Sequence, residues 1–324
     1  MSELPYAEAI ELLSMSDSFF IATHSNPDGD TIGSALALWN YLSNAGKKDL
    51  FLYNEGKIPY YLEFLKGHEN FSTGVPDREF DVAVLIDVGD LERVNEDLGK
   101  KLKFRHSLVI DHHLTVTGFG DIKLIDSDAA ATGVILYRLM KKWKEEWISV
   151  DAAEAIYTAI FTDTGSFRFS NTDSESLHIA AELVRKGVDP SRVASNVYEN
   201  YPFSKLHLLS AVLSTLTRDI KGRWAYIVVT RDMFARTGAT PDMLEEVINY
   251  VRGIRGVEVA IQFREIEENV YKVGFRSKRV DVERIARKFG GGGHKNASGC
   301  KITGPYEKIV SDVVREVERS LQNG

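Results

Sequence analysis

The sequence predicts an α/β protein in which a doubly wound, mainly parallel sheet is joined by a helical linker to a smaller α+β domain. Strand and helix patterns alternate through about the first 190 residues, as in doubly wound domains. The apolar run Val82–Ile86 is continuous, which is typical of a parallel strand covered on both faces. With 324 residues, the chain is long enough for two domains of ordinary size.

The first domain is predicted at residues 1–188. Its expected strands are Phe19–Ala22, Leu50–Tyr53, Val82–Ile86, Ser107–Ile110 and Ile122–Ile125. Its expected helices are Thr31–Ala45, Gly133–Lys144, Ala152–Phe161 and Ser174–Lys186. In the first of these helices, Ile32, Leu36 and Trp39 recur on one face at helical spacing, which indicates a side packed against the sheet.

The linker is predicted at residues 189–217 as helical segments broken at Pro202, and the second domain at residues 218–324. The strands expected there are Trp224–Val229, Val257–Phe263 and Val270–Phe275. The expected helices are Pro241–Val251, Val282–Lys288 and Tyr306–Leu321, with a glycine run between the last two. Glycines of this kind allow close approach of a phosphate or a base to the backbone, although a flexible loop has the same composition.

The composition is that of an ordinary globular protein, with 44% hydrophobic residues and a single cysteine. One cysteine excludes a disulfide framework and a cysteine-rich zinc site, and fits a reducing compartment. No apolar run is long enough to span a membrane, and the N-terminus lacks a secretory signal pattern. We therefore expect a cytoplasmic protein without a membrane partner.

The net charge of −7 is unevenly distributed along the chain. Residues 215–324 hold 20 basic and 15 acidic residues, a balance of +5, whereas residues 1–214 hold 20 basic and 32 acidic residues, a balance of −12. The overall charge argues against a polyanion ligand, but a metal site among the acids would leave the basic part to face the substrate.

Acidic and imidazole side chains follow the strands of the first domain. They are His24, Asp28 and Asp30 after the first strand, Asp87 after the third, Asp111, His112 and His113 after the fourth, and Asp163 after a later helix. Taken singly, each fits a turn, a helix cap or a loop. Together at one sheet edge, they would repel unless cations neutralised them, and the set suits two divalent ions such as Mn²⁺ sharing one aspartate.

These residues resemble the motifs of the DHH phosphoesterase superfamily. The resemblance rests on His24-x-x-Pro27-Asp28-x-Asp30, Asp87, Asp111-His112-His113 and Asp163. Later in the chain, Gly290-Gly291-Gly292-Gly293-His294 and Phe275-Arg276-Ser277 resemble the GGGH signature of the DHH-associated C-terminal domain and its preceding strand. The compact layout is most similar to stand-alone members of the NrnA type.

The resemblance implies a role for each motif residue. One ion is expected on His24, Asp28 and Asp87, and the other on Asp30, Asp87, His112 and Asp163, with Asp87 bridging. Mn²⁺ is favoured for both positions, with Mg²⁺ and Co²⁺ as alternatives. The catalytic group would comprise Asp87, His113 as phosphate contact and general acid, and Asp111 as its orienting partner. The substrate contacts would be His113, Arg168, Arg276, Gly292, Gly293 and His294.

The activity implied is metal-dependent hydrolysis of very short oligonucleotides (nanoRNA) and linear dinucleotides such as pApA, with pAp phosphatase activity, by attack of a hydroxide activated by two metals. Cyclic di-AMP is a further candidate substrate, whereas long duplex nucleic acid is not expected. The alternatives are a RecJ-like single-strand exonuclease, a family II pyrophosphatase and a non-catalytic cyclic-dinucleotide binding protein. The sequence leaves open the substrate preference, the polarity of cleavage, the physiological metal and whether the chain forms a homo-oligomer.

Overall fold

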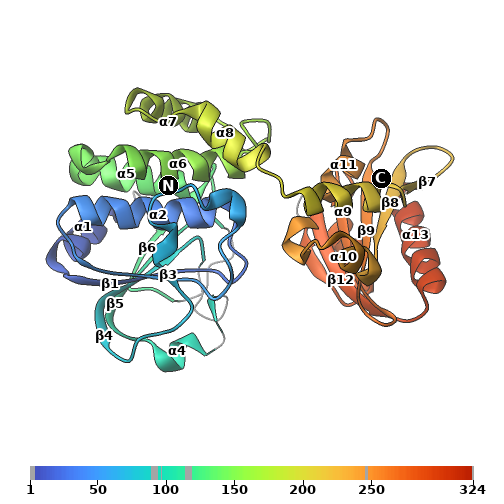
Figure 1. Ribbon diagram of the computed structural model, residues 1–324, viewed down its shortest axis with the longest axis horizontal. Helices are drawn as coiled ribbons and strands as arrows, with labels where there is room; N and C mark the ends of the chain where they lie inside the picture. Colours follow the sequence, from blue (N-terminus) through green and yellow to red (C-terminus); the bar gives the residue numbers. More distant parts are fainter. Residues whose placement is uncertain (1–3, 89–93, 96, 114–118, 245–246, 323–324) are drawn as a thin grey trace. The chain divides into compact units, whose positions relative to one another are not determined.

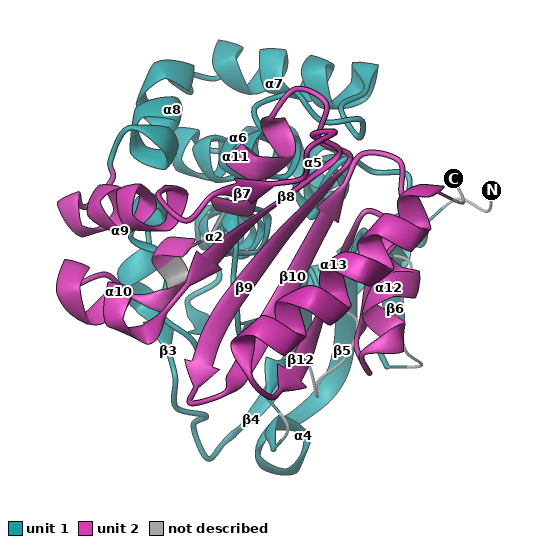
Figure 2. Cartoon of the chain, turned by 90° about the vertical axis from the view of Figure 1, so that its right-hand side faces the viewer, with its two compact units in different colours: residues 1–200 teal, residues 201–324 magenta. Residues whose placement is uncertain are grey.

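The computed structural model describes residues 4–88, 94–95, 97–113, 119–244 and 247–322. The chain divides into two compact units, residues 1–200 and 201–324, coloured separately in Figure 2. Each unit contains a six-stranded sheet of its own. This arrangement confirms the predicted fold class, whereas the predicted domain and linker boundaries stay predictions.

The sheet of the first unit has the strand order β3-β2-β1-β4-β5-β6, and its described pairings are all parallel. Its strands are β1 (Ser18–Thr23), β2 (Asp49–Tyr53), β3 (Phe71–Ser72), β4 (Glu79–Ile86), β5 (Lys103–Asp111) and β6 (Ile122–Ile125). Neighbours β2 and β4 lie on opposite sides of β1, so the strand order reverses there. Ligands of such sheets bind beyond the carboxyl ends of the strands at this reversal.

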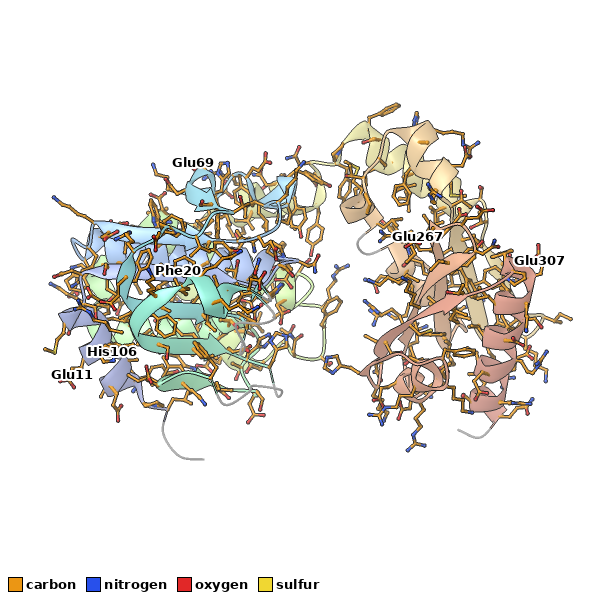
Figure 3. All side chains as sticks on the ribbon, turned by 90° about the horizontal axis from the view of Figure 1, so that it is seen from below. Glu11, Phe20, Glu69, His106, Glu267 and Glu307 are labelled. Carbon is orange, nitrogen blue, oxygen red and sulfur yellow. The ribbon has the colours of Figure 1, made fainter. Side chains whose placement is uncertain are left out.

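Helices cover both faces of this sheet (Figure 1). They are α1 (Tyr6–Met15), α2 (Gly29–Asn44), α4 (Leu98–Lys101), α5 (Thr132–Lys144), α6 (Val150–Asp163), α7 (Ser174–Arg185) and α8 (Pro190–Tyr198), with short 3₁₀ turns at Tyr60–Leu62, His68–Asn70 and Glu145–Trp147. One face packs against α1, α2, α5 and α6, and the other against α4. Phe20 of β1, labelled in Figure 3, is fully buried on the α4 side.

Helix α2 begins at Gly29, two residues before the predicted start. Asp28 is its N-cap and accepts the backbone N–H of Thr31 at 3.0 Å, which supplies one of the donors that a helix start leaves unpaired. Further along α2, Gly33 lies so close to α6 that a Cβ there would come within 2.6 Å of the carbonyl oxygen of Ala155. The close packing of α2 on α6 therefore requires glycine at this position.

Reciprocal serine–aspartate hydrogen bonds join neighbouring strands at the amino end of the sheet. Asp81 of β4 accepts the backbone N–H groups of Asp17 and Ser18 at 3.0 Å each, and its own N–H donates to the Ser18 hydroxyl. Ser107 of β5 and Asp121 before β6 repeat this pattern. These bonds fix the register of strands whose opposite ends carry the candidate site.

The sheet of the second unit has the order β11-β12-β10-β9-β8-β7 (Figure 2). Its strands are β7 (Thr217–Arg218), β8 (Trp224–Val229), β9 (Val259–Glu267), β10 (Val270–Ser277), β11 (Gly292–His294) and β12 (Ala297–Thr303). Its helices are α9 (Phe203–Leu213), α10 (Arg231–Thr237), α11 (Val247–Gly253), α12 (Val282–Lys288) and α13 (Tyr306–Gln322), with a 3₁₀ turn at Pro241–Leu244. One apolar cluster lies under α12 and α13, and a second under α9, α10 and α11.

Three predicted segments of this unit differ from the structure. The strand predicted at Val257–Phe263 spans Val259–Glu267. The helix predicted at Pro241–Val251 is divided into a 3₁₀ turn and α11, and residues 245–246 between them lie outside the described part. The last two residues of the glycine run, Gly292 and Gly293, form strand β11 together with His294, and this strand pairs with β12. Within the described ranges, no helix combines the length and the apolar character needed to cross a membrane.

Candidate metal centre

The predicted acids and imidazoles of the first unit meet at the carboxyl edge of its sheet. His24 follows β1, Asp87 follows β4, and Asp111 ends β5 just before His112 and His113. Asp28 and Asp30 enter from the start of α2, and Asp163 is the last residue of α6. Because these strands are parallel and adjacent, their polar ends lie side by side.

One group of potential ligands consists of His24, Asp28 and Asp87, whose ligand atoms all lie within 4.8 Å of one another. The hydroxyl of Thr31 lies among them, 2.7 Å from His24 Nε2, 2.9 Å from Asp28 Oδ1 and 2.6 Å from Asp87 Oδ2. A single hydroxyl proton can be donated to only one of these acceptors at a time. Thr31, which the sequence analysis did not identify, therefore orients this group.

A second group consists of Asp30, His112 and Asp163. His112 Nε2 lies 3.7 Å from Asp30 Oδ2, 3.9 Å from Asp163 Oδ2 and 3.8 Å from Asp87 Oδ1. Asp87 thus presents Oδ1 to this group and Oδ2 to the group around His24. One carboxylate shared by two ligand groups is the arrangement needed to bridge two ions.

The N-terminus of α5 supports both Asp30 and Asp87. The backbone N–H groups of Thr132 and Gly133 donate to Asp30 at 2.7 and 3.0 Å, and Ser34 Oγ donates to the same carboxylate at 3.0 Å. The Thr132 hydroxyl donates to Asp87 Oδ1 at 2.8 Å, as Thr31 does to Oδ2. If the Thr31 and Thr132 hydroxyls both donate to Asp87, Oδ1 and Oδ2 of this carboxylate each retain one lone pair that could bind an ion.

Burial and mutual repulsion perturb the acidity of the carboxylates. Burial, followed by the charges of Asp87, Asp163 and Asp28, raises the pKa of Asp30 well above its usual range, against the opposing Thr132 N–H. Burial also raises the pKa of Asp163 to about 6, although His112 opposes the rise. Burial alone would raise the pKa of Asp87, but contacts with His24, His113 and Thr31 outweigh it and lower the net value. Such a crowded set is stabilised by bound cations.

Asp111 forms a hydrogen-bonded pair with His113, which also belongs to a third group of potential ligands with Asp87 and His112. Asp111 Oδ1 accepts the backbone N–H of His113 at 2.9 Å and lies 2.7 Å from its Nδ1. Asp111 is fully buried, and its Oδ2 has no hydrogen-bond partner among the described residues. Because Nδ1 faces Asp111, proton exchange between His113 and a substrate would use Nε2.

Unusual backbone conformations occur at this edge of the sheet. Asp87 has a φ of +59°, although it is not a glycine. After α6, Gly165, Ser166 and Phe167 have φ values of +56°, +61° and +60°, and the carbonyl of Gly165 accepts a hydrogen bond from Arg168 Nε at 2.6 Å. Left-handed non-glycine residues are energetically costly and concentrate at functional sites. The predicted substrate residue Arg168 therefore lies on a constrained turn five residues after Asp163.

The remaining predicted substrate residues belong to the second unit. Arg276 lies on β10, whereas Gly292, Gly293 and His294 form β11. The Arg276 guanidinium donates to the carbonyl of the preceding residue at 3.1 Å, and burial together with nearby Arg252 lowers its pKa. Gly293 has a φ of +139°, and a Cβ there would come within 2.7 Å of the Ala297 carbonyl oxygen, so the close approach of β11 to β12 requires glycine.

The donor atoms of the first unit fit divalent ions. They are carboxylate oxygens and imidazole nitrogens with no thiolate, because the single cysteine, Cys300, lies on β12 of the second unit. Oxygen and imidazole ligands suit hard or borderline ions, among them Mn²⁺ and Mg²⁺. The structure therefore contains side chains that could hold metal, without specifying which metal.

Comparisons with known families identify both units. Residues 18–160 match the model of the DHH family, N-terminal domain. Residues 222–323 match the model of the DHHA1 domain. The first range contains nearly all of the predicted ligands, and Asp163 follows it by three residues.

Similar proteins cover nearly the whole chain. A Thermus thermophilus protein named bifunctional oligoribonuclease and PAP phosphatase NrnA is 33% identical, over 93% of this chain and 90% of the relative. A Bacillus subtilis protein of the same name is 29% identical, over 94% and 96%. The structure of an exopolyphosphatase-related protein from Bacteroides fragilis superposes with a TM-score of 0.87 at 28% identity, covering 98% of this chain and 95% of that one.

Proposed function

The chain belongs to the DHH family, and on that premise we propose that it is a metal-dependent hydrolase that cleaves very short oligonucleotides to mononucleotides and dephosphorylates pAp. The observation that carries the proposal is the pair of ligand groups joined through Asp87. The full-length likeness to proteins named oligoribonuclease and PAP phosphatase supports phosphoester bonds as the target.

The proposed ligands come from two of the three groups that the geometry forms; the third consists of Asp87, His112 and His113. His24, Asp28 and Asp87 would hold one ion. Asp30, His112 and Asp163 would hold a second ion together with Asp87. Two bound divalent ions would lower the pKa of a water and neutralise charge that develops on the phosphoryl oxygens. Mn²⁺ is our choice for both.

The residues around these ligands have separate tasks. Thr31 and Thr132 hold Asp87 through its two oxygens, and the start of α5 holds Asp30. His113, oriented by Asp111, would donate a proton from Nε2 to the ribose oxygen that leaves phosphorus. Water supplies the new oxygen on the phosphate, and the leaving oxygen departs as a hydroxyl group.

The second unit is proposed to bind nucleotide rather than metal. Arg276 supplies a guanidinium group and His294 an imidazole, while Gly292 and Gly293 add no side chains to this part of the backbone. Arg168 of the first unit is proposed as a further phosphate contact. Linear dinucleotides such as pApA are the expected substrates, cyclic di-AMP is a further candidate, and the cytoplasm is the expected location.

The test compares several substrates with the metal-stripped protein after Mn²⁺ is restored. The substrates are pApA, pAp, cyclic di-AMP, a 24-nucleotide RNA and pyrophosphate. We expect AMP from pApA and from pAp, slow turnover of the 24-mer and no cleavage of pyrophosphate. Preferred cleavage of the 24-mer would favour a RecJ-like exonuclease, and binding of cyclic di-AMP without any hydrolysis would favour a sensor; either result would refute the proposal.

A pair of variants ties the activity to the site. Asp87→Asn should abolish hydrolysis, because a neutral amide cannot bridge two cations. Asp128→Asn is the matched control, because this carboxylate is exposed on the loop before α5 and belongs to neither ligand group. Near-normal turnover by Asp87→Asn would contradict the bridging role.

A further inference from the structure

The chain after α6 folds back onto Asp163 through the side chain of Asn171. The amide nitrogen of Asn171, Nδ2, lies 3.2 Å from Oδ2 of Asp163 and 3.2 Å from the carbonyl oxygen of the same residue. The same nitrogen lies 3.0 Å from the carbonyl oxygen of Ala130, in the loop before α5. Asn171 belongs to none of the predicted motifs, yet it joins two segments that carry or support predicted ligands.

The three acceptors determine how the amide of Asn171 is oriented. An amide nitrogen carries two protons, so it can donate to Ala130 and to Asp163 at the same time. An amide oxygen in its place would face three other oxygens with no proton between them. The partners of Asn171 therefore fix its side chain, although the residue is exposed.

The Asp163 oxygen that Asn171 contacts is the one that faces the second ligand group. Oδ2 of Asp163 lies 3.9 Å from Nε2 of His112, and the two residues belong to the same group of potential ligands. A carboxylate oxygen has two lone pairs, so Oδ2 can accept the Asn171 proton and still bind an ion. Because Asp163 is the last residue of α6, this hydrogen bond restrains a carboxylate at a helix end.

Ala130 connects Asn171 to the histidine of the same group. The carbonyl oxygen of the preceding residue, Ala129, lies 3.2 Å from Nδ1 of His112. A proton donated from Nδ1 to this carbonyl leaves Nε2 unprotonated and able to bind an ion. Because Asn171 holds the next carbonyl along the chain, it restrains the peptide that orients His112.

The other end of this loop, residues 126–131, is anchored independently. The carboxylate of Asp126 accepts a hydrogen bond from Arg138 of α5 at 2.6 Å. The backbone N–H of Asp126 donates to the carbonyl oxygen of Asp111 at 3.2 Å. The loop is thus attached to α5 and β5 at its start, and Asn171 supplies a contact near its end.

We propose that Asn171 is a positioning residue for the second ion, because one amide holds both the Asp163 carboxylate and the loop that orients His112. The inference rests on the proposed function and deepens it, since it makes one side chain responsible for the geometry of one of the two ions. In the described part of the chain, no member of the group around His24 forms a hydrogen bond with Asn171. Loss of the amide should therefore weaken binding of the second ion and spare the first.

The test isolates each ion before Asn171 is changed. His24→Ala leaves the second ligand group intact, and His112→Ala leaves the first. Asn171→Ala is added to each variant, and Mn²⁺ binding to the metal-stripped protein is measured from the loss of the free-ion EPR signal. In the His24→Ala protein, Asn171→Ala should weaken Mn²⁺ binding by about 10- to 100-fold, the usual effect of losing a group that orients a metal ligand. In the His112→Ala protein, it should leave Mn²⁺ binding unchanged.

Asn44→Ala is the matched control in both proteins. Asn44 is also exposed, and its amide also donates to a carbonyl oxygen far away in the sequence, that of Trp147 at 3.2 Å. It is the last residue of α2, whereas the predicted ligands Asp28 and Asp30 lie at the start of this helix. The control should bind Mn²⁺ as its parent variant does.

Two results would overturn the inference. Equal weakening in the two proteins would make Asn171 a general support of the fold, and unchanged binding in the His24→Ala protein would show that Asp163 and His112 keep their positions without it. Both results come from metal binding alone. Absence of AMP release from pApA by the wild type would instead refute the proposed function, so the two failures are distinguishable.

Discussion

The role of α5 in holding the bridging aspartate is tested by Thr132→Val. The substitution removes the hydroxyl that donates to Asp87 Oδ1 at 2.8 Å and keeps the branched shape of the fully buried side chain. The backbone N–H that Thr132 donates to Asp30 remains. The change is therefore confined to one hydrogen bond on one oxygen of Asp87.

The expected magnitude follows from that hydrogen bond. A bond to a charged group contributes about 1.5–3 kcal/mol, and 1.4 kcal/mol corresponds to a factor of ten in an equilibrium constant. Loss of a group that orients a metal ligand typically lowers metal affinity by about 10- to 100-fold. We therefore expect the weaker of the two Mn²⁺ affinities to fall by about 10- to 100-fold, with a parallel loss of activity at limiting metal.

The assay is calorimetric titration of metal-stripped protein with Mn²⁺, with hydrolysis of pApA followed at each metal concentration. Thr158→Val is the matched control, because Thr158 is equally buried on α6 but its hydroxyl donates to the Glu154 carbonyl oxygen within the helix. The control should bind Mn²⁺ as the wild type does. Wild-type Mn²⁺ affinity in folded Thr132→Val would refute the argument that α5 positions Asp87.

Two further predictions concern stability. Gly33→Ala should lower the free energy of unfolding, measured by thermal or denaturant unfolding, by about 1–3 kcal/mol. The new Cβ would overlap the Ala155 carbonyl oxygen, and this cost outweighs the gain in helix propensity from alanine. An unchanged or raised stability would show that α2 and α6 can separate. The backbone N–H groups of Asp17 and Ser18 lower the pKa of Asp81 in the folded protein. The Asp81 carboxylate therefore stabilises the fold at pH values above its unfolded pKa of about 3.9, and this stabilisation is lost as the pH falls through the folded pKa. Asp81→Asn should therefore lower the free energy of unfolding by about 1 kcal/mol at pH 7, and the variant should lose less stability on acidification than the wild type. Parallel dependence of the free energy of unfolding on pH in the two proteins would contradict this account.

The sequence predicted the parts of the fold and site that depend on local patterns. Apolar runs located the main strands, and the polar residues after them located the ligand groups, because parallel strands end at one edge of a sheet. The start of α2 was predicted at Thr31 rather than Gly29, because an aspartate such as Asp28 is common both in turns and at helix N-caps, and the sequence does not distinguish the two.

Features that depend on tertiary contacts were not predictable in this way. Thr31 and Thr132 occur in segments where threonine is compatible with an ordinary helix start, and only the fold brings their hydroxyls to Asp87. The glycine run was not predicted as a strand because glycine disfavours strands. Its pairing with β12 supplies hydrogen bonds that overcome that preference.

The central claim is that two divalent ions bridged by Asp87 support hydrolysis of short oligonucleotides. It is tested most directly by following AMP release from pApA as Mn²⁺ is titrated into the metal-stripped protein, with bound metal measured at each point. The account predicts no release without metal and full activity only when two ions are bound per chain. Full activity in the presence of EDTA, or a plateau at one ion per chain, would contradict it.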